Sequence, residues 1–135
     1  MEQRHATAAD VVTELNSRFL AGDHDAARRL LAPDVRIVQP ASLPHGGTHR
    51  GSDGMGAMAA RFGEHWTRQI AEPCVLACGE TAVQVTTQTW RSHATGRSAT
   101  VEVVELFTVT NGVVREIRVF PQDTDLLLRT LSEPG

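Results

Sequence analysis

The sequence predicts one α+β domain in which helices cover a curved antiparallel sheet and leave a pocket for a small molecule. Up to Trp66, segments with helical spacing surround a single strand. Beyond it, the pattern alternates with a period of two as far as residue 120, and a short helical segment follows Pro121. A chain of 135 residues has room for one hydrophobic core, so residues 1–135 are expected to form a single domain.

Two helices are predicted first. Residues 7–20 carry apolar side chains at helical spacing, namely Val11, Val12, Leu15, Phe19 and Leu20. Gly22 ends this segment, and Asp23 can cap a second, short helix that stops near Pro33.

A strand and a third helix follow. The sequence DVRIVQP predicts a strand that Pro40 ends, with Gln39 on the face of Ile37. Residues 41–50 are expected to form a loop. A third helix is predicted from Gly51 to near Trp66, with Ser52 as its N-cap and an apolar stripe of Met55, Met58, Ala59 and Phe62.

The second half predicts an antiparallel meander. Its strands are expected at 68–78, 81–92, 98–110 and 113–120, joined by turns in CGET, SHATGR and TNG. The sequence DTDLLLRTL then predicts a last short helix, which Asp123 can cap.

Composition narrows the function. The net charge of −3 offers no field for nucleic acid, and no apolar run suggests a membrane span or signal peptide. We therefore expect a cytoplasmic protein with neither partner. The chain has no Lys and no Tyr, which excludes Schiff-base chemistry and a phenolic acid. Cys74 and Cys78 would lie about 13 Å apart on one strand, too far for a disulfide, and are expected to be buried thiols.

Glu105 is the strongest catalytic candidate. It shares the inward face of strand 98–110 with Val101, Val103 and Phe107, where loss of solvation raises the pKa of a carboxyl group toward neutrality. Such a group can act as a general acid or base. Alternatively, Glu105 pairs with Arg91, which we expect on the inward face of strand 81–92 together with Val83 and Val85.

Further candidates lie in the loops and at strand ends. His45 and His49 are expected at the mouth of the pocket, where they can exchange protons or are merely solvated. Gln39 can orient a carbonyl group or a water molecule, or is a satisfied core amide. Asp123 is either a third catalytic group or the helix cap.

Apolar side chains are expected to line the pocket or to belong to the core, namely Met58, Phe62 and Trp66. The spacing of His and carboxylate residues matches no metal motif, so neither metal nor cofactor is expected. The outward face of the sheet is expected to carry Gln84, Thr86, Gln88 and Trp90 with Val104 and Leu106, and to form a homodimer contact.

Several segments resemble a known superfamily. They are LNSRFLAGDHDAARRLLAPDVRIVQP, LPHGGTHRG, VEVVELFTV and VREIRVFPQDTDLLLRTL. Together they resemble the SnoaL-like and ketosteroid-isomerase-like branch of the nuclear transport factor two-like superfamily. The resemblance implies a cystatin-like α+β barrel, in which a cone-shaped sheet packs on three N-terminal helices around an internal pocket, and it also implies a homodimer.

The resemblance also places functional residues. The general-base Asp of ketosteroid isomerases corresponds to Gln39, and their oxyanion-donor Tyr corresponds to Leu15, so neither chemistry is available at those positions. Their second oxyanion donor corresponds to Glu105. The catalytic Asp of SnoaL-like cyclases has its nearest counterpart in Asp123, displaced toward the tail.

Two functions follow from these expectations. The first is a cofactor-independent acid–base enzyme that cyclises, isomerises or dehydrates a small apolar metabolite, as in polyketide ring closure. Glu105 would be its acid or base, His45 the proton partner and Gln39 the orienting amide. The second is a non-catalytic protein of the same fold that binds a small molecule or assembles as a dimer.

Overall fold

Helix α1 (Ala8–Leu20) opens the computed structural model, which describes residues 7–71 and 73–132. It begins at a capping box: Thr7 Oγ1 accepts from Asp10 N at 3.1 Å, and Asp10 Oδ2 accepts from Thr7 N at 3.0 Å. Helix α2 (His24–Arg28) begins at Asp23, whose Oδ1 accepts from Ala26 N at 3.1 Å. Helix α1 lies where the sequence predicts it, whereas α2 ends at Arg28, before the predicted end near Pro33, because residues 31–33 already belong to strand β1.

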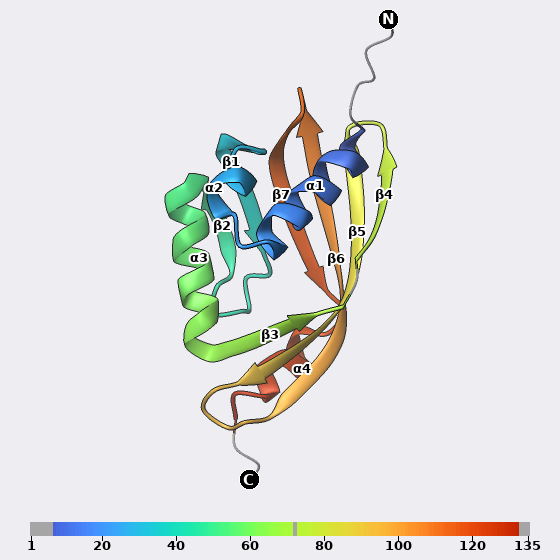
Figure 1. Cartoon of the computed structure of the whole chain (residues 1–135). Coiled ribbons are helices and arrows are strands. Elements are labelled where there is room, and N and C mark those ends of the chain that lie inside the picture. Colours follow the sequence, from blue (N-terminus) through green and yellow to red (C-terminus); the bar gives the residue numbers. More distant parts are fainter. Residues whose placement is uncertain (1–6, 72, 133–135) are drawn as a thin grey trace, which may run out of the picture.

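Seven strands form one curved sheet (Figure 1). They are β1 (Leu31–Gln39), β2 (Gly47–Arg50), β3 (Trp66–Ile70), β4 (Cys74–Cys78), β5 (Thr81–Ser92), β6 (Ser98–Thr110) and β7 (Val113–Pro121). Their order is β2-β1-β7-β6-β5-β3, and β4 also pairs with β5. The predicted meander is present in β5, β6 and β7, whereas β1 pairs with β7 in parallel, so the sheet is mixed.

The predicted strand 68–78 is in fact two strands. Both pair with β5, β3 along residues 88–92 and β4 along residues 81–85. Pro73 precedes β4 and has no N–H with which to continue a ladder. The predicted loop 41–50 likewise contains a short strand, β2, which pairs with the end of β1.

Helix α3 (Gly51–His65) follows β2 without a loop (Figure 1). Its N-cap position is Arg50 and no side chain caps it, so the prediction of Ser52 as N-cap is wrong. Gly51 makes the abrupt turn with φ +67°, and a Cβ there would lie 3.1 Å from Pro33 O.

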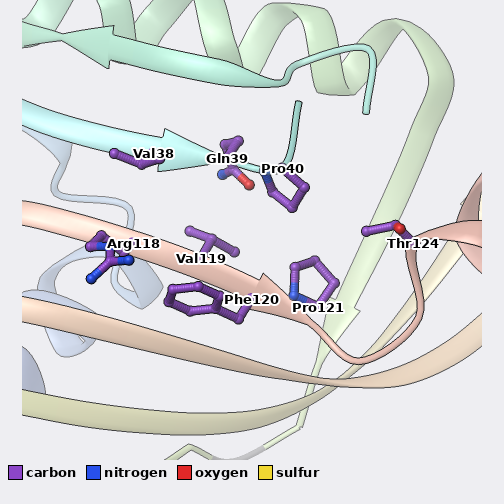
Figure 2. A pocket seen from close by; sticks show the side chains of 8 residues that line it. All are labelled: Val38, Gln39, Pro40, Arg118, Val119, Phe120, Pro121 and Thr124. Atoms are coloured by element: carbon purple, nitrogen blue, oxygen red, sulfur yellow. The ribbon is translucent and has the colours of Figure 1, made fainter. Parts of the chain in front are cut away.

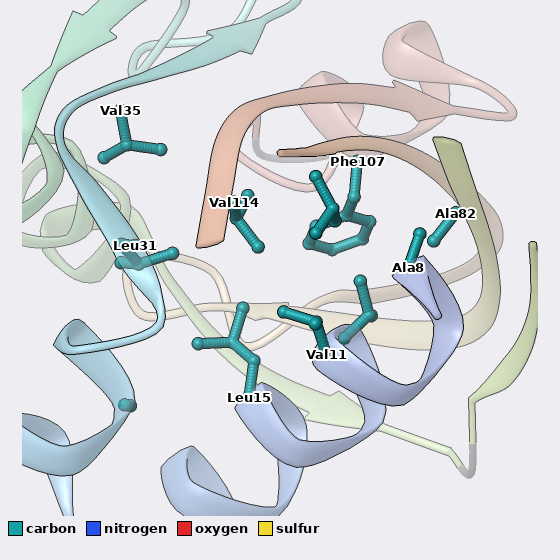
Figure 3. Close-up of a cluster of buried hydrophobic side chains, with 11 residues drawn as sticks. Ala8, Val11, Leu15, Leu31, Val35, Ala82, Phe107 and Val114 are labelled. Atoms are coloured by element: carbon teal, nitrogen blue, oxygen red, sulfur yellow. The ribbon is translucent and has the colours of Figure 1, made fainter. Parts of the chain in front are cut away.

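Helix α1 packs its apolar face on the sheet, as Figure 3 shows. Val11 and Leu15 point toward Phe107 of β6 and Val114 of β7. Removal of this apolar surface from water stabilises the packing of α1 on β6 and β7. The buried members of this cluster are Ala8, Val11, Val12, Leu15, Ala27, Leu31, Val35, Ala82, Phe107, Val109 and Val114.

A second apolar cluster occupies the opposite end of the sheet, beside helix α4 (Thr124–Arg129). Its buried members are Leu43, Trp66, Trp90, Ala99, Val101, Val103 and Leu127. Trp66 Nε1 donates to Thr130 Oγ1 at 2.8 Å, which ties the end of α4 to β3.

Helix α3 has no fully buried residue. Met55, Met58 and Phe62 are half-buried, whereas Ala59 of the predicted stripe is exposed. Cys74 and Cys78 are exposed free thiols, so the prediction that they are buried is wrong. They lie on β4, opposite Val85 and Thr81 of β5. Within the residues described, no helix combines the length and apolar character that crossing a membrane requires.

Candidate functional site

Strand β5 turns a polar face toward the helices. Gln84, Thr86, Gln88 and Ser92 are buried there, on the same face as Ala82 and Trp90. The sequence predicted the opposite orientation, with Val83, Val85 and Arg91 inward, and that prediction is wrong. Val83 and Val85 are half-buried on the outer face, and Arg91 is exposed.

A chain of hydrogen bonds satisfies part of this polar face. Trp90 Nε1 donates to Gln88 Oε1 at 2.9 Å, and Gln88 Nε2 donates to Thr86 Oγ1 at 2.9 Å. Thr86 Oγ1 in turn donates to the carbonyl oxygen of Val103 at 3.5 Å. Because an indole N–H can only donate, Trp90 fixes the direction of every bond in the chain.

A second chain leads to Glu105. Asn16 Nδ2 of α1 donates to Gln84 Oε1 at 2.5 Å, and Gln84 Nε2 donates to Glu105 Oε1 at 3.0 Å. Gln84 and Glu105 are direct cross-strand partners on β5 and β6. Glu105 is half-buried on the helix side of β6, next to buried Val103 and Phe107, so its predicted orientation is confirmed.

Of the two carboxyl oxygens of Glu105, one accepts a hydrogen bond and the other is available to a ligand. Among the described residues, Oε1 accepts from Gln84, while Oε2 has no hydrogen-bond partner and is not sealed from solvent. Burial raises the pKa of Glu105; the Gln84 hydrogen bond and the positive charge of Arg68 act in the opposite direction. The site therefore presents an oxygen with raised proton affinity to an approaching molecule.

Arg68 is the cation that acts on Glu105, a role the sequence assigned to Arg91. Arg68 is the cross-strand partner of Trp90, so its side chain leaves β3 on the helix side of the sheet. Its guanidinium lies over the ring of Phe62, 5.1 Å from the centroid. Arg91 faces the other side, opposite Ser98.

Arg68 is an exposed residue of β3. Burial of its guanidinium lowers the pKa of Arg68, and the charge of Glu105 raises it. No ion pair within 4.0 Å joins Arg68 to Glu105 or to another described carboxylate.

His45 is buried, contrary to the expected position at the mouth of a pocket. Only 4% of its surface is exposed, and its ring contacts Phe62, Trp66 and Trp90 at centroid distances of 5.2, 6.0 and 5.8 Å. Nδ1 is buried without a hydrogen-bond partner among the described residues. Burial, followed by the positive charges of Arg68, His49 and His65, lowers the pKa of His45 to about 4, so the ring is neutral at pH 7.

His49 and Gln39 make local contacts. His49 Nε2 donates to the carbonyl oxygen of His45 at 2.8 Å and anchors the loop before α3. Gln39 Nε2 donates to Met58 Sδ at 3.5 Å. Asp123 Oδ1 accepts from Leu126 N at 3.0 Å, so its side chain is the N-cap of α4, one of the two roles the sequence allowed.

A hollow of about 310 Å³ opens where β1 and β7 part (Figure 2). The parallel pairing ends at Val38 and Arg118. Pro40, which follows β1, and Pro121, the last residue of β7, have no N–H to donate to a ladder. Val119, in the wall of this hollow, is the cross-strand partner of Glu105. The lining residues are Val38, Gln39, Pro40, Arg118, Val119, Phe120, Pro121 and Thr124.

The sequence alone did not identify Arg68, Gln84 or Asn16 as part of the site. For Arg68, the sequence did carry one signal: the alternation of side chains in the strand WTRQI places Arg68 on the same face as Trp66. The described residues contain no group of three or more His, Cys, Asp or Glu side chains arranged to hold a metal ion.

Comparison with known proteins gives a consistent result. The protein-family model of the SnoaL-like domain matches residues 12–117 of this chain. An NTF2-like protein of Burkholderia xenovorans is 27% identical, with a TM-score of 0.83 over 94% of this chain and 98% of that one. No curated protein sequence matches the chain.

More distant structures share the fold. The protein TerC, crystallised with polyporic acid, is 20% identical, with a TM-score of 0.81 over 95% of this chain and all of that one. A Pseudomonas putida structure with the provisional name polyketide cyclase is 17% identical, with a TM-score of 0.76 over 95% of this chain and 100% of that one. At these identities the likeness concerns the fold alone.

Proposed function

The chain belongs to the SnoaL-like domain family, and on that premise we propose that it is a cofactor-independent enzyme that performs acid–base chemistry on a small, largely apolar metabolite. The observation that carries this proposal is the open Oε2 of Glu105. A general base needs a lone pair that no other donor uses, and a proton affinity near the working pH. Glu105 meets the first requirement by geometry and approaches the second through burial.

The neighbours of Glu105 hold it in place. Gln84 fixes Oε1, and Asn16 fixes Gln84, so that Oε2 keeps one direction without a rearrangement of the carboxyl group. Catalysis benefits from such pre-orientation because no energy is spent on ordering the base during the reaction.

The substrate is proposed to lie between the hollow and the aromatic residues of α3 and β3. Val119 brings the hollow next to Glu105, Gln39 and Met58 meet beside it, and the half-buried ring of Phe62 supplies an apolar surface. Gln39 would orient a carbonyl group, which an amide can do by donating a hydrogen bond.

Two of the predicted catalytic residues have no part in this proposal. His45 is neutral at pH 7 and enclosed by aromatic rings, so it is not the proton partner of Glu105. Asp123 uses its carboxylate as the cap of α4.

Ring closure of a polyketide is the reaction we favour. It requires proton transfer at carbon in a site with little water, and it needs no metal or redox group. Two fold relatives add modest support, since one carries the provisional name polyketide cyclase and TerC was crystallised with polyporic acid.

The experiment uses three probes of different chemistry: an enolisable aromatic ketone in D₂O, a β-hydroxy ketone and styrene oxide. We expect the wild type to act on at least one of them. Glu105→Gln should lower that rate by about 100-fold or more, the usual contribution of a general base. Glu102→Gln is the matched control, because Glu102 lies on the same strand and is exposed on the other face. An unchanged rate in Glu105→Gln contradicts the proposal.

A non-catalytic binding protein is the second candidate. It is favoured by the residues at the two positions where related isomerases carry a base and a phenol, namely the half-buried amide Gln39 and the buried Leu15. Tight binding of aromatic ketones without turnover of any probe would support this alternative.

We also propose that the chain forms a homodimer through the outer face of the sheet. The half-buried side chains Val83, Val85 and Leu106 lie there, close to Leu76 and Phe120, whose surfaces are 64% and 44% exposed. Phe120→Glu should convert a dimer to a monomer in sedimentation equilibrium, whereas Phe19→Glu on α1 should not. A wild type that sediments as a monomer at micromolar concentration contradicts the proposal.

A further inference from the structure

We infer that a second hollow, on the outer face of the sheet, binds a phosphoryl group through Arg50 and Arg115, which makes phosphate monoesters its ligand class. This arginine hollow has a volume of about 340 Å³. Glu105 lies on the helix side of the sheet, so the two sites are separate and neither depends on the other. The residues that line the arginine hollow are Asp34, Arg36, Arg50, Thr108, Arg115 and Glu116.

Four of the lining residues form one row across neighbouring strands. Arg50 of β2 is the cross-strand partner of Arg36 of β1. Arg36 is also opposite Glu116 of β7, and Glu116 is opposite Thr108 of β6. Both chain neighbours of Arg36 are buried, and successive side chains of a strand point to opposite faces. The row therefore lies on the outer face, away from the helices.

The pairing of β1 with β7 is irregular beside this row. Strand β1 advances five residues between its pairings at Leu31 and Arg36, whereas β7 advances only two. Asp34 lies in the stretch between these pairings and lines the hollow. The interrupted register leaves room between the two strands that a regular ladder would close.

A β-bulge in β7 adds Arg115 to the same hollow. Thr108 is opposite Glu116, and the next residue of β6 is opposite Val114, so Arg115 is the extra residue. In a regular strand, two consecutive residues point to opposite faces. The bulge instead lets Arg115 and Glu116 line one hollow, which is how bulges re-aim side chains.

Most of the positive charge in the arginine hollow has no partner within the described part of the chain. Arg36 forms an ion pair with Glu116. The side chains of Arg50 and Arg115 form neither an ion pair nor a hydrogen bond with a described residue. Arg36 and Arg50 are directly opposite each other, and like charges in that position repel. A bound anion would relieve this repulsion.

The charge balance favours a doubly charged anion. Two unpaired guanidinium groups exceed the one unpaired carboxylate of the hollow, which belongs to Asp34. Guanidinium groups bind phosphate oxygens with paired N–H donors, and a phosphate monoester carries close to two negative charges at neutral pH. The hydroxyl group of Thr108 can donate to a further oxygen. A carboxylate or a sulfate ester carries one charge and matches only one of the two cations.

The test compares phenyl phosphate with phenyl sulfate, which has the same ring and a similar shape but one negative charge fewer. Isothermal titration calorimetry at pH 8 in dilute buffer should show that the wild type binds the phosphate ester more tightly. Arg50→Gln and Arg115→Gln should each weaken this binding by about 5- to 10-fold, as expected for a charge pair at a partly exposed site. Asp34→Asn should strengthen it, because a like charge is removed.

Arg91→Gln is the matched control. Arg91 is exposed on the outer face at the other end of β5, opposite Ser98, and should not contribute to binding. Equal affinity of the wild type for both esters overturns the inference. An equal loss of phenyl phosphate binding in Arg91→Gln and Arg50→Gln also overturns it, because the attraction would then be a property of the whole surface.

Glu105→Gln separates the arginine hollow from the proposed catalytic site. This variant should bind phenyl phosphate as the wild type does, and Arg50→Gln should keep the wild-type turnover of ketone probes. If Glu105→Gln alters phenyl phosphate binding as much as Arg50→Gln does, the ester binds on the helix side and the inference is wrong. Absence of turnover with every probe contradicts the proposed enzyme and leaves the phosphate site supported by its own binding data.

Discussion

Gln84 and Glu105 face each other across β5 and β6, and the amide donates a hydrogen bond of 3.0 Å to Oε1 of the carboxyl group. This bond stabilises the charged form of Glu105, while burial favours the neutral form. In setting the proton affinity of the proposed base, burial is therefore opposed by the Gln84 hydrogen bond and by the positive charge of Arg68.

Gln84→Met should raise the pKa of Glu105 further, because the donor to Oε1 is lost while burial remains. It also leaves Asn16 Nδ2 without its acceptor, which should cost about 1–3 kcal/mol of stability. A ¹³C NMR titration of the Glu105 carboxyl carbon measures the shift. Thr87→Met on the exposed face of β5 is the control, and a Glu105 titration that moves equally in both variants would refute the assignment.

Glu105→Gln should stabilise the fold at alkaline pH. The folded-state pKa of Glu105 is raised above its unfolded value of 4.5, so the wild type is most favoured below that pH and loses stability as the pH rises through the folded-state pKa. The neutral amide avoids this loss, and we expect a gain of about 1 kcal/mol at pH 8 that disappears at pH 4. Urea denaturation at the two pH values checks it, with Glu102→Gln expected to show no such difference.

Acidification should destabilise the protein through His45. Its folded-state pKa of about 4 lies below the ordinary 6.5, so between these values the unfolded chain binds a proton that the folded chain excludes. Stability is complete above pH 6.5 and falls as the pH approaches 4, by roughly 3 kcal/mol. Arg68, His49 and His65 are the charged groups that contribute to this effect.

His45→Phe tests this origin. The phenyl ring suits the aromatic surroundings and removes the titratable group, so the slope of stability against pH between 6.5 and 4 should flatten. His24→Gln, at an exposed position of α2, should keep the wild-type slope. Equal slopes in all three proteins would show that His45 is not responsible.

Trp66→Phe should loosen the C-terminal helix. Trp66 Nε1 donates to Thr130 Oγ1 at 2.8 Å, and Thr130 Oγ1 donates to the carbonyl oxygen of Leu127 at 2.6 Å. Loss of the indole donor should cost about 1–3 kcal/mol and speed hydrogen exchange in α4 (Thr124–Arg129) relative to α1. Unchanged exchange in α4 would mean that apolar packing alone holds the helix.

The order of helices and strands could be predicted from local pattern. The spacing of Val11, Val12 and Leu15 marks α1, and the alternation around Glu105 gives the correct face of β6. The same rule failed for β5, where Val83 and Val85 lie on the outer face and amides are buried. Polar and apolar residues alternate there in the expected way, but alternation alone does not say which face is covered.

Residues of the candidate site likewise divide into those that local sequence patterns could predict and those that they could not. Glu105 could be identified because its apolar neighbours on one strand fix its surroundings. Arg68 could not, because its relation to Glu105 depends on β3 ending where β4 begins and on α3 placing Phe62 under the guanidinium. His45 was misplaced because a loop sequence does not reveal the aromatic rings that enclose it.

By itself, the sequence determined the α+β fold and the inward carboxyl group of Glu105, since periodicity and burial of apolar side chains are properties of neighbouring residues. The tertiary structure decided which face of β5 is covered, that Gln84 and not Arg91 meets Glu105, and that Arg68 is the cation whose charge lowers the pKa of Glu105. These features depend on register and on contacts between residues far apart in the chain, such as Asn16 with Gln84, and no local pattern encodes them.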